Sequence, residues 1–198
     1  YNFWRAKDEI RKKKEIIISE GQMEVIRLHT IGVNNAVALL GTSFTNEHLN
    51  IIKNIKANVI LNLDQDEAGK IATIKIGDML LNEGINSTVI IYSSYKDTDE
   101  LILNEGAESF NKAYQARVSF IDFKLNYLKK NKDLSVAEDL SIYIKSAIDT
   151  INEIEDDILK EVKIQWLAKE YEISEDLIRS KIKIENNNSI SNNPYFPT

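Results

Sequence analysis

Short apolar runs alternate with stretches of helical periodicity through the first hundred residues of the chain. Four runs rich in β-branched residues are predicted as strands: residues 15–18, 35–40, 58–63 and 88–92. Five stretches carry apolar residues at helical spacing: residues 3–14, 22–30, 45–56, 67–83 and 100–104. Strands that alternate with helices form mostly parallel sheets with helices on both faces. The pattern therefore predicts an α/β domain.

A different pattern follows residue 107, where the strand signal stops. Apolar residues recur three and four positions apart from Leu140 to Leu159, which predicts one long amphipathic helix or two helices separated near Asp156. The run SVAE at residues 135–138 is predicted as a capping box, in which a serine and a glutamate satisfy the first backbone amides of a helix. We expect a helical bundle here.

The last residues, from Glu185 onward, are rich in Asn, Ser and Pro and are predicted as a linker. The predicted organisation has three parts: an α/β domain at 1–106, an all-α helical bundle at 107–184 and a tail at 185–198. Because the sequence opens at Tyr1 without an initiator Met or a signal peptide, we interpret it as a fragment of a longer protein.

Composition excludes several classes of protein. The 198 residues contain no apolar run long enough to cross a membrane, and no membrane partner is expected. The absence of cysteine excludes disulfides and thiolate zinc sites within this sequence, and a cytoplasmic location is expected. The net charge of -6 argues against a chain that binds nucleic acid through an extended positively charged surface.

Carboxylates follow three of the predicted strands. Glu20 follows the first, Asp64 and Asp66 follow the third, and Asp97 and Asp99 follow the fourth. The carboxyl ends of parallel strands meet at one edge of a sheet, where ligands commonly bind. Oxygen donors without cysteine suit a hard cation, so Mg²⁺ or Mn²⁺ is favoured over zinc. The sequence predicts a metal-binding rim suited to phosphoryl transfer.

Each of these acids also has a structural explanation. An aspartate after a strand often caps the next helix, and Glu20 could stabilise the positive end of a helix. Glu24, four residues after Glu20, could support the metal ligands from behind or lie on a solvated helix face. The residues alone favour the solvated face for Glu24.

Several motifs together resemble the Toprim domain of DnaG-type primases, topoisomerases and related nucleases. The run SEGQMEVI at 19–26 resembles the primase motif EGYMDVI, LGTSFT at 40–45 resembles LGTSLT, and KDTDE at 96–100 resembles KDPDE. Asp64-x-Asp66 followed by Ala68-Gly69 completes the set. The motifs occur in the order of the bacterial DNA primase family, and the resemblance covers nearly the whole chain.

This resemblance implies a fold and a function. The fold is an α/β Toprim domain followed by an all-α bundle, the catalytic part of an RNA polymerase core that synthesises short RNA primers for replication. Glu20, Asp64 and Asp66 would be catalytic, and Mg²⁺ or Mn²⁺ would be held by Glu20, Asp64, Asp66, Asp97 and Asp99, with Glu24 supporting them.

The resemblance also implies partners outside this sequence. The implied partners are a single-stranded DNA template, nucleoside triphosphates, the RNA primer and a replicative helicase. Zinc would belong to a separate cysteine-bearing module, and the helicase would bind a domain beyond the tail. Without the zinc module and the basic template groove, the chain alone is expected to be inactive or very weak.

Three residues depart from the family motifs, and two other functions remain open. Glu24 replaces Asp, Gln65 replaces Gly and Thr98 replaces Pro. A Toprim nuclease or topoisomerase would share Glu20 and the Asp64/Asp66 pair, although no domain carrying a tyrosine nucleophile is evident. A non-catalytic docking module for replication partners would explain the bundle but not the acidic rim.

Overall fold

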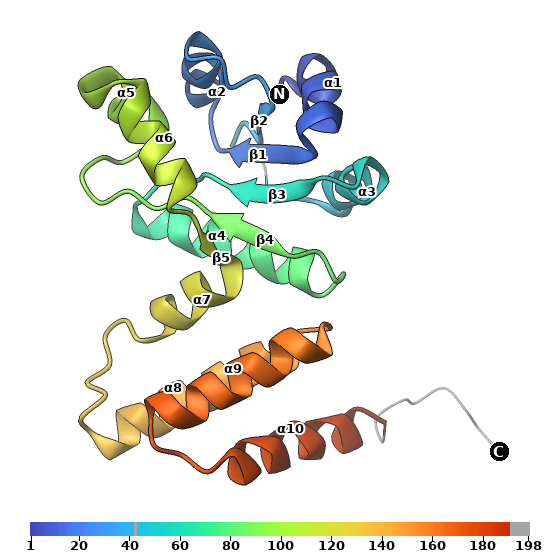
Figure 1. Ribbon diagram of the computed structural model, residues 1–198, viewed down its shortest axis with the longest axis vertical. Coiled ribbons are helices and arrows are strands. Elements are labelled where there is room, and N and C mark those ends of the chain that lie inside the picture. Colours follow the sequence, from blue (N-terminus) through green and yellow to red (C-terminus); the bar gives the residue numbers. More distant parts are fainter. Residues whose placement is uncertain (42, 191–198) are drawn as a thin grey trace, which may run out of the picture. The chain divides into compact units, whose positions relative to one another are not determined.

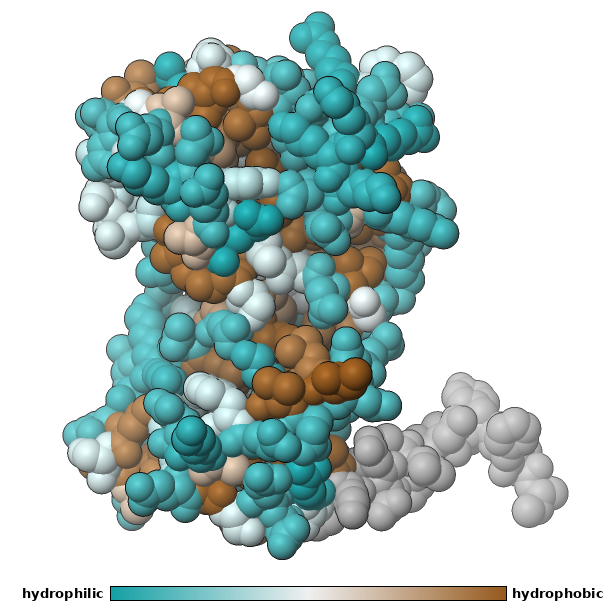
Figure 2. Space-filling model, viewed as in Figure 1, coloured by the Kyte–Doolittle hydropathy of each residue, from teal (hydrophilic) through white to brown (hydrophobic). Residues whose placement is uncertain are grey.

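The computed structural model describes residues 1–41 and 43–190, with side chains described up to residue 182. The chain forms two compact units, Tyr1–Phe123 and a second unit that begins at Lys124. Hydrophilic residues cover most of the face shown in Figure 2, and hydrophobic residues appear on it in scattered patches. Within the described residues, no helix combines the length and the apolar character needed to span a membrane.

A five-stranded sheet forms the centre of the first unit, with the order β2-β1-β3-β4-β5. Its strands are β1 (Glu15–Ser19), β2 (Ala36–Ala38), β3 (Asn58–Leu61), β4 (Ser87–Val89) and β5 (Val118–Ser119). The first four strands are parallel, as the alternating pattern predicted, and β5 pairs antiparallel with β4. The expectation that strands end before residue 107 is therefore wrong, because a two-residue strand is too short to show periodicity.

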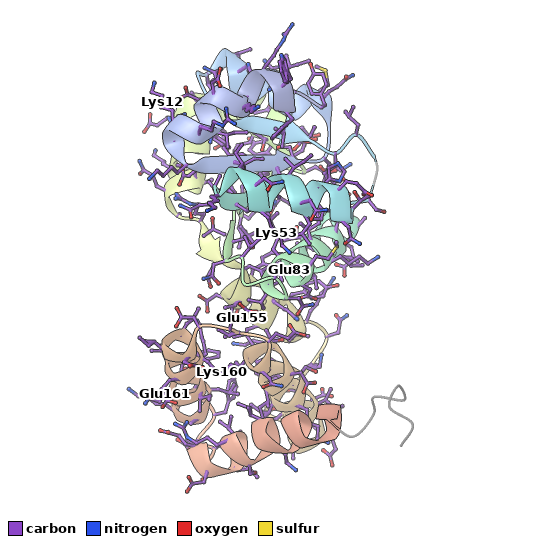
Figure 3. All side chains as sticks on the ribbon, turned by 90° about the vertical axis from the view of Figure 1, so that its right-hand side faces the viewer. Lys12, Lys53, Glu83, Glu155, Lys160 and Glu161 are labelled. Atoms are coloured by element: carbon purple, nitrogen blue, oxygen red, sulfur yellow. The ribbon has the colours of Figure 1, made fainter. Side chains whose placement is uncertain are left out.

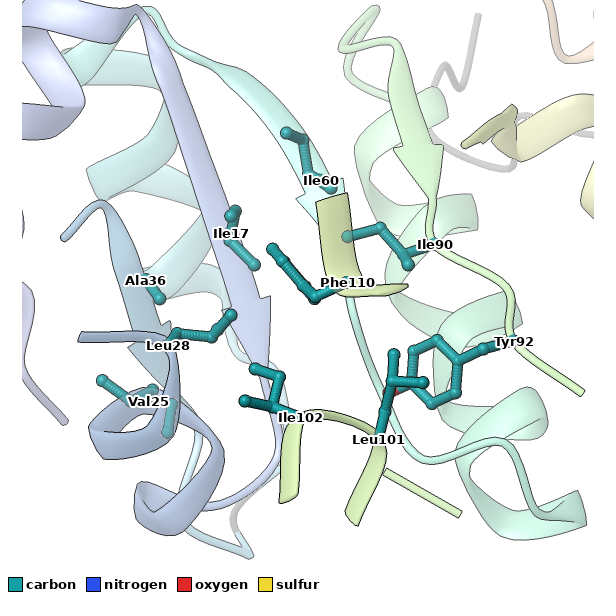
Figure 4. Close-up of a cluster of buried hydrophobic side chains, with 11 residues drawn as sticks. Ile17, Val25, Leu28, Ala36, Ile60, Ile90, Tyr92, Leu101, Ile102 and Phe110 are labelled. Carbon is teal, nitrogen blue, oxygen red and sulfur yellow. The ribbon is translucent and has the colours of Figure 1, made fainter. Parts of the chain in front are cut away.

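Among the residues of the first unit that the structure describes, seven helices begin (Figure 1). They are α1 (Phe3–Lys13), α2 (Gln22–Thr30), α3 (Asn46–Ile55), α4 (Glu67–Leu81), α5 (Thr98–Glu105), α6 (Ala107–Gln115) and α7 (Phe120–Leu128). Helices α2, α5 and α6 cover one face of the sheet and contribute Leu28, Ile102 and Phe110 to a core that includes Ile17 and Ile60 (Figure 4). In Figure 1, α4 lies behind the strands, on the other side from α5 and α6.

The first unit extends past residue 106, where the sequence placed the end of the α/β domain. Phe110 of α6 is only 1% exposed and belongs to the core of the sheet. Gly77 of α4 has no side chain because the Phe120 ring occupies that space: a Cβ there would lie 2.0 Å from Phe120 Cε2. Residues 107–123 therefore complete the α/β unit.

Three helices form the bundle of the second unit: α8 (Ala137–Asn152), α9 (Asp157–Glu170) and α10 (Glu175–Ile190). The predicted break near Asp156 is confirmed, because Asp156 Oδ1 accepts hydrogen bonds from the amides of Ile158 and Leu159, both at 2.9 Å. Tyr143, which is fully buried, packs its ring against that of Tyr171, with the ring centres 5.3 Å apart and the planes tilted by 59°. The expected helical bundle is thus present.

Two local predictions for this unit are wrong. Ser135 does not cap α8, since its hydroxyl donates to Asp133 Oδ1 at 2.6 Å and Val136 precedes the helix. Helix α10 continues to Ile190, so residues 185–190 are helical rather than part of a linker. The rest of the predicted tail, residues 191–198, lies outside the described residues.

The role of α6 in the sheet core can be tested by truncating Phe110. Phe110→Ala should lower the free energy of unfolding by about 3–5 kcal/mol, because the vacated space cannot be filled by its packed neighbours. Trp4, which is 84% exposed, provides the matched aromatic control, and Trp4→Ala should change stability by less than about 0.5 kcal/mol. Urea denaturation of both variants makes the comparison. Equal, small effects would show that residues beyond 106 are not part of this core.

Candidate active site

An open groove of about 670 Å³ lies at the carboxyl edge of the sheet. Five acidic residues line it: Glu20, Glu24, Asp64, Asp97 and Asp99. Glu20 and Asp64 follow the ends of β1 and β3, Asp97 lies between β4 and α5, and Glu24 and Asp99 lie in the first turns of α2 and α5. This is the convergence that parallel strands predict. Asp66 does not line the groove, although it lies two residues from Asp64. The structure therefore gathers most of the predicted site residues in one place.

Two of the predicted site residues also cap helices. Asp66 Oδ1 accepts a hydrogen bond from the amide of Gly69 at 2.9 Å, at the start of α4. Asp97 Oδ1 accepts one from the amide of Glu100 at 2.9 Å, at the start of α5. The helix-capping role considered for these aspartates is thus real, but each cap uses only one of the two carboxylate oxygens.

A close approach of α4 fixes the position of Asp64. A Cβ atom on Gly69 would lie 2.1 Å from the carbonyl oxygen of Asp64, so only glycine allows the helix to begin this near to the strand end. The Asp64 amide in turn donates to Glu20 Oε1 at 3.2 Å. This bond joins the carboxylates that follow β1 and β3.

Glu24 is buried beneath the groove, with an exposed fraction of 4%. Its Oε2 accepts a hydrogen bond from the amide of Gly21 at 2.7 Å, while its Oε1 is buried without a hydrogen-bond partner. Burial raises the pKa of Glu24 to about 8, and burial together with the Asp64 charge raises the pKa of Glu20. The interpretation of Glu24 as a solvated surface residue is therefore wrong.

Two basic side chains neutralise the aspartates around the groove. Lys96 Nζ lies 3.0 Å from Asp64 Oδ2 and 3.7 Å from Asp66 Oδ2, and its pKa is raised by the hydrogen bond to Asp64 and by the charges of both aspartates. Arg27 Nε lies 2.6 Å from Asp99 Oδ1. In this arrangement, no three acidic or histidine side chains among residues 1–41 and 43–190 are grouped so as to hold a metal ion. The metal-ligand assignments remain predictions.

A buried hydrogen-bond network ties the three acidic segments together. Asn62 Nδ2 donates to Ser19 Oγ at 3.1 Å and to Thr98 Oγ1 at 2.7 Å, and the Tyr92 hydroxyl lies 2.9 Å from Thr98 Oγ1. Ser19, Asn62 and Thr98 are fully buried. Ser19 precedes Glu20, Asn62 lies two residues before Asp64, and Thr98 separates the two aspartates of α5. The network therefore fixes the spacing of the groove.

The sequence reasoning missed this network, although it contained a signal. Asn62 is a polar residue inside the apolar run at 58–63, and a buried amide requires hydrogen-bond partners. Thr98 is the first residue of α5, a helical position at which proline is favoured, so a primase-type Pro would fit the same backbone. Threonine at this position adds the hydroxyl that binds Asn62 and Tyr92.

Gln65 supports the groove from between the two aspartates. Its backbone amide donates to the carbonyl of Lys96 at 2.7 Å. Its side-chain amide donates to the carbonyl of Leu63 at 2.9 Å. A glycine, which the related motif has here, could not make the side-chain contact.

Two family models match the chain. One, described as Toprim-like, matches residues 17–102, which include every predicted site residue. The other, described as the DnaB-helicase binding domain of primase, matches residues 121–176, most of which lie in the second unit. The sequence predicted a helicase-binding domain beyond the tail, which nothing within the chain tests, and this match shows a similarity to such a domain inside the chain.

Curated relatives and solved structures agree with both models. The chain is 34% identical over 185 residues to a DNA primase of Listeria innocua and 34% identical over 200 residues to one of Staphylococcus aureus, covering 92% and 100% of this chain. It spans only 30% and 32% of the length of these relatives.

Among solved structures, the DnaG primase catalytic domain bound to single-stranded DNA matches 89% of this chain and 57% of that chain. Its TM-score is 0.77 at 25% identity. The catalytic core of the E. coli primase matches 88% of this chain and 56% of that chain, with a TM-score of 0.75 at 26% identity. The expected Toprim fold with its following helices is thus confirmed.

The buried network generates a prediction about stability. Thr98→Val keeps the shape of the side chain but removes the hydroxyl, which leaves the buried Asn62 and Tyr92 side chains short of a hydrogen-bond partner. We expect a loss of about 1–3 kcal/mol in the free energy of unfolding. Thr30→Val is the control, since its exposed hydroxyl bonds only to the carbonyl of Arg27. Urea denaturation in the presence of chelator measures both; a Thr98→Val protein as stable as the parent would contradict the proposed importance of the network.

Glu24 generates a prediction about pH. Its pKa in the folded protein, about 8, lies above the ordinary value of 4.5, so the native state holds an additional proton between these values. Stability should therefore fall as the pH rises from 4.5 to 8, by at most about 1.4 kcal/mol per unit from this group. Glu24→Gln should flatten this dependence and be the more stable protein above pH 8 in chelator. Parallel curves for the two proteins between pH 5 and 9 would refute this assignment.

Proposed function

Because this chain belongs to the bacterial DnaG-type DNA primase family, we propose that it is the catalytic Toprim part of an enzyme that synthesises short RNA primers on single-stranded DNA. The observation that carries this proposal is the acidic groove, in which Glu20, Asp64, Asp97 and Asp99 converge from three strand ends. Nucleoside triphosphates, the template and the growing primer are the proposed substrates. The place of action would be the replication fork in the bacterial cytoplasm.

The groove suits divalent cations. Its donors are carboxylate oxygens, which Mg²⁺ and Mn²⁺ prefer, and the buried Oε1 of Glu24 is an oxygen that lacks any partner in the protein. We assign the cation ligands to Glu20, Asp64, Asp66, Asp97 and Asp99, with Glu24 supporting them from below. When bound, such cations would neutralise nucleotide phosphates, orient the transferring phosphoryl group and activate the attacking hydroxyl.

The protein's own groups supply position rather than covalent chemistry. Glu20 is held by the amide of Asp64, and the buried Asn62 fixes the distance between the strand ends. A carboxylate held in place before the substrate arrives does not need to reorganise during the reaction, which is where such sites gain most of their rate enhancement. An acidic groove would repel a triphosphate on its own, so substrate binding should depend on the cations.

A second contact is proposed for the helical unit. The match of residues 121–176 to a helicase-binding domain of primase supports a contact with the replicative helicase through helices α8 and α9. This proposal adds a contact within the chain to the helicase-binding domain that is expected beyond the tail. The nuclease and topoisomerase alternatives have no observation in their favour, since the relatives described above are primases.

The first test of the proposed function concerns cations. Mg²⁺ or Mn²⁺ at one hundred times its dissociation constant should stabilise the chain by about 2.7 kcal/mol, because it binds the folded state and relieves repulsion among the carboxylates. Thermal melting with cation or chelator measures this effect. Asp64→Asn/Asp66→Asn should abolish it, whereas Glu108→Gln, an exposed change on α6, should retain it. The same response from all three proteins would remove the case for a metal site.

The second test concerns catalysis and needs this chain in the context of a full-length primase, since the chain alone is expected to make essentially no primers. Glu20→Gln keeps an oxygen for the Asp64 amide but removes the charge, so the fold should survive while primer synthesis drops by about 100-fold or more. Glu24→Asp restores the residue usual in primases, and activity within a few-fold of the parent is expected. A folded and fully active Glu20→Gln enzyme would reduce Glu20 to a structural acid.

A further inference from the structure

We infer that Lys96 is a tethered counter-ion for the cation site: its ammonium group bridges Asp64 and Asp66 and must leave when a divalent cation binds there. This inference deepens the proposed function and rests on the metal site described there. It assigns to Lys96 the role of a residue that positions the aspartates and competes with the cation.

The bridge joins both aspartates of one motif. Lys96 Nζ lies 3.0 Å from Asp64 Oδ2 and 3.7 Å from Asp66 Oδ2. Asp64 is the more buried of the two aspartates, with 15% of its side chain exposed against 46% for Asp66. Two carboxylates so close together repel each other when no cation lies between them. The ammonium group removes this repulsion.

The backbone holds Lys96 in place for this contact. Its carbonyl accepts a hydrogen bond from the amide of Gln65, the residue between the two aspartates, at 2.7 Å. Its amide donates to Glu100 Oε2 at 3.1 Å, in the first turn of α5. Lys96 is thus fixed at both its backbone groups, and its flexible side chain reaches over the Asp64-Gln65-Asp66 segment. The bridge is therefore a built feature of the fold rather than a chance contact between long surface side chains.

Lysine and a divalent cation cannot share these oxygens. A magnesium ion takes its ligands at about 2.1 Å, in a near-octahedral shell that leaves no room for an ammonium group on the same carboxylate oxygen. A cation bound to Asp64 Oδ2 or Asp66 Oδ2 would therefore have to take the place of the Lys96 ammonium group. Displacement of Lys96 would free Oδ2 of both aspartates at once. About half of the Lys96 side chain is exposed, so it can swing outward into solvent.

Arg27 does not serve the same purpose. Its Nε atom binds Asp99, and both side chains are largely buried, with exposed fractions of 27% and 22%. Arg27 lies on α2 and Asp99 on α5, two helices packed against each other, so this ion pair joins elements of the fold. The Lys96 side chain is 54% exposed against 27% for Arg27, so a cation can displace Lys96 more easily.

The test measures cation affinity and the chemical reactivity of the Lys96 amine, and neither requires catalysis. Three variants are compared with the parent chain: Lys96→Met, which removes the charge; Lys96→Arg, which keeps it; and Lys53→Met. Lys53 pairs with Glu83 at the ends of α3 and α4 (Figure 3), so its loss removes one ion pair and one charge away from the groove. Free Mn²⁺ is followed by electron paramagnetic resonance, and lysine acetylation is followed by mass spectrometry with and without Mg²⁺.

Lys96→Met should bind Mn²⁺ about three- to tenfold more tightly, since the cation no longer competes with a partly exposed ion pair. Lys96→Arg should not show this gain, and Lys53→Met should stay within about twofold of the parent. In the unaltered chain, the Lys96 amine should become several-fold more reactive when Mg²⁺ is added, while Lys53 should not change.

Two results would overturn the inference without touching the proposed function. Mn²⁺ binding by Lys96→Met that is equal to or weaker than that of the parent would show that the lysine does not compete with the cation. An unchanged reactivity of Lys96 on addition of Mg²⁺ would show that the amine stays in place, so that any gain in affinity reflects charge at a distance. If neither the parent nor Lys96→Met binds Mn²⁺, the metal site itself is absent, and the proposed function fails with the inference.

Discussion

Mutual repulsion among carboxylates is the constraint on which the first unit depends. The fold brings Glu20, Glu24, Asp64, Asp97 and Asp99 to one groove, and the charge of Asp64 adds to burial in raising the pKa of Glu20 and of Glu24. The protein meets this cost in three ways. Glu24 is buried with a raised pKa, two aspartates share the Lys96 ammonium group, and Asp99 pairs with Arg27.

Rigidity beneath the groove makes this arrangement possible. The buried amide and hydroxyl groups of Asn62 and Thr98 satisfy each other inside the sheet, so the strand ends cannot separate without breaking buried hydrogen bonds. Gly69 has a complementary role, because it lets α4 approach the carbonyl of Asp64 closely. The repulsion among the groove carboxylates is therefore opposed by the buried hydrogen bonds of Asn62 and Thr98 and by the close packing at Gly69.

The sequence predicts the parts of this structure that depend on local pattern. Parallel strands followed by carboxylates, a glycine at the start of α4 and a helix break at Asp156 all have signals a few residues long. Prediction from the sequence fails where contacts with residues far along the chain determine the local structure. The two-residue β5 exists only because β4 offers an unpaired edge, and α6 joins the first unit because Phe110 fits between α2, α5 and the sheet. Ser135 turns away from α8 because Asp133 is the nearer partner.

The candidate site also has features that local sequence predicts and features that depend on distant contacts. Its acidic residues could be named from the sequence, because their positions after strands are a local property. Their protonation and their partners could not, since both depend on burial and on side chains from other segments. Glu24 illustrates this point. Its helical spacing is compatible with a solvated face, yet the packing of α2 against the sheet buries its side chain and leaves Oε1 of its carboxylate without a hydrogen-bond partner. Burial in the folded chain raises the pKa of this carboxyl to about 8, and helical spacing alone gives no sign of it.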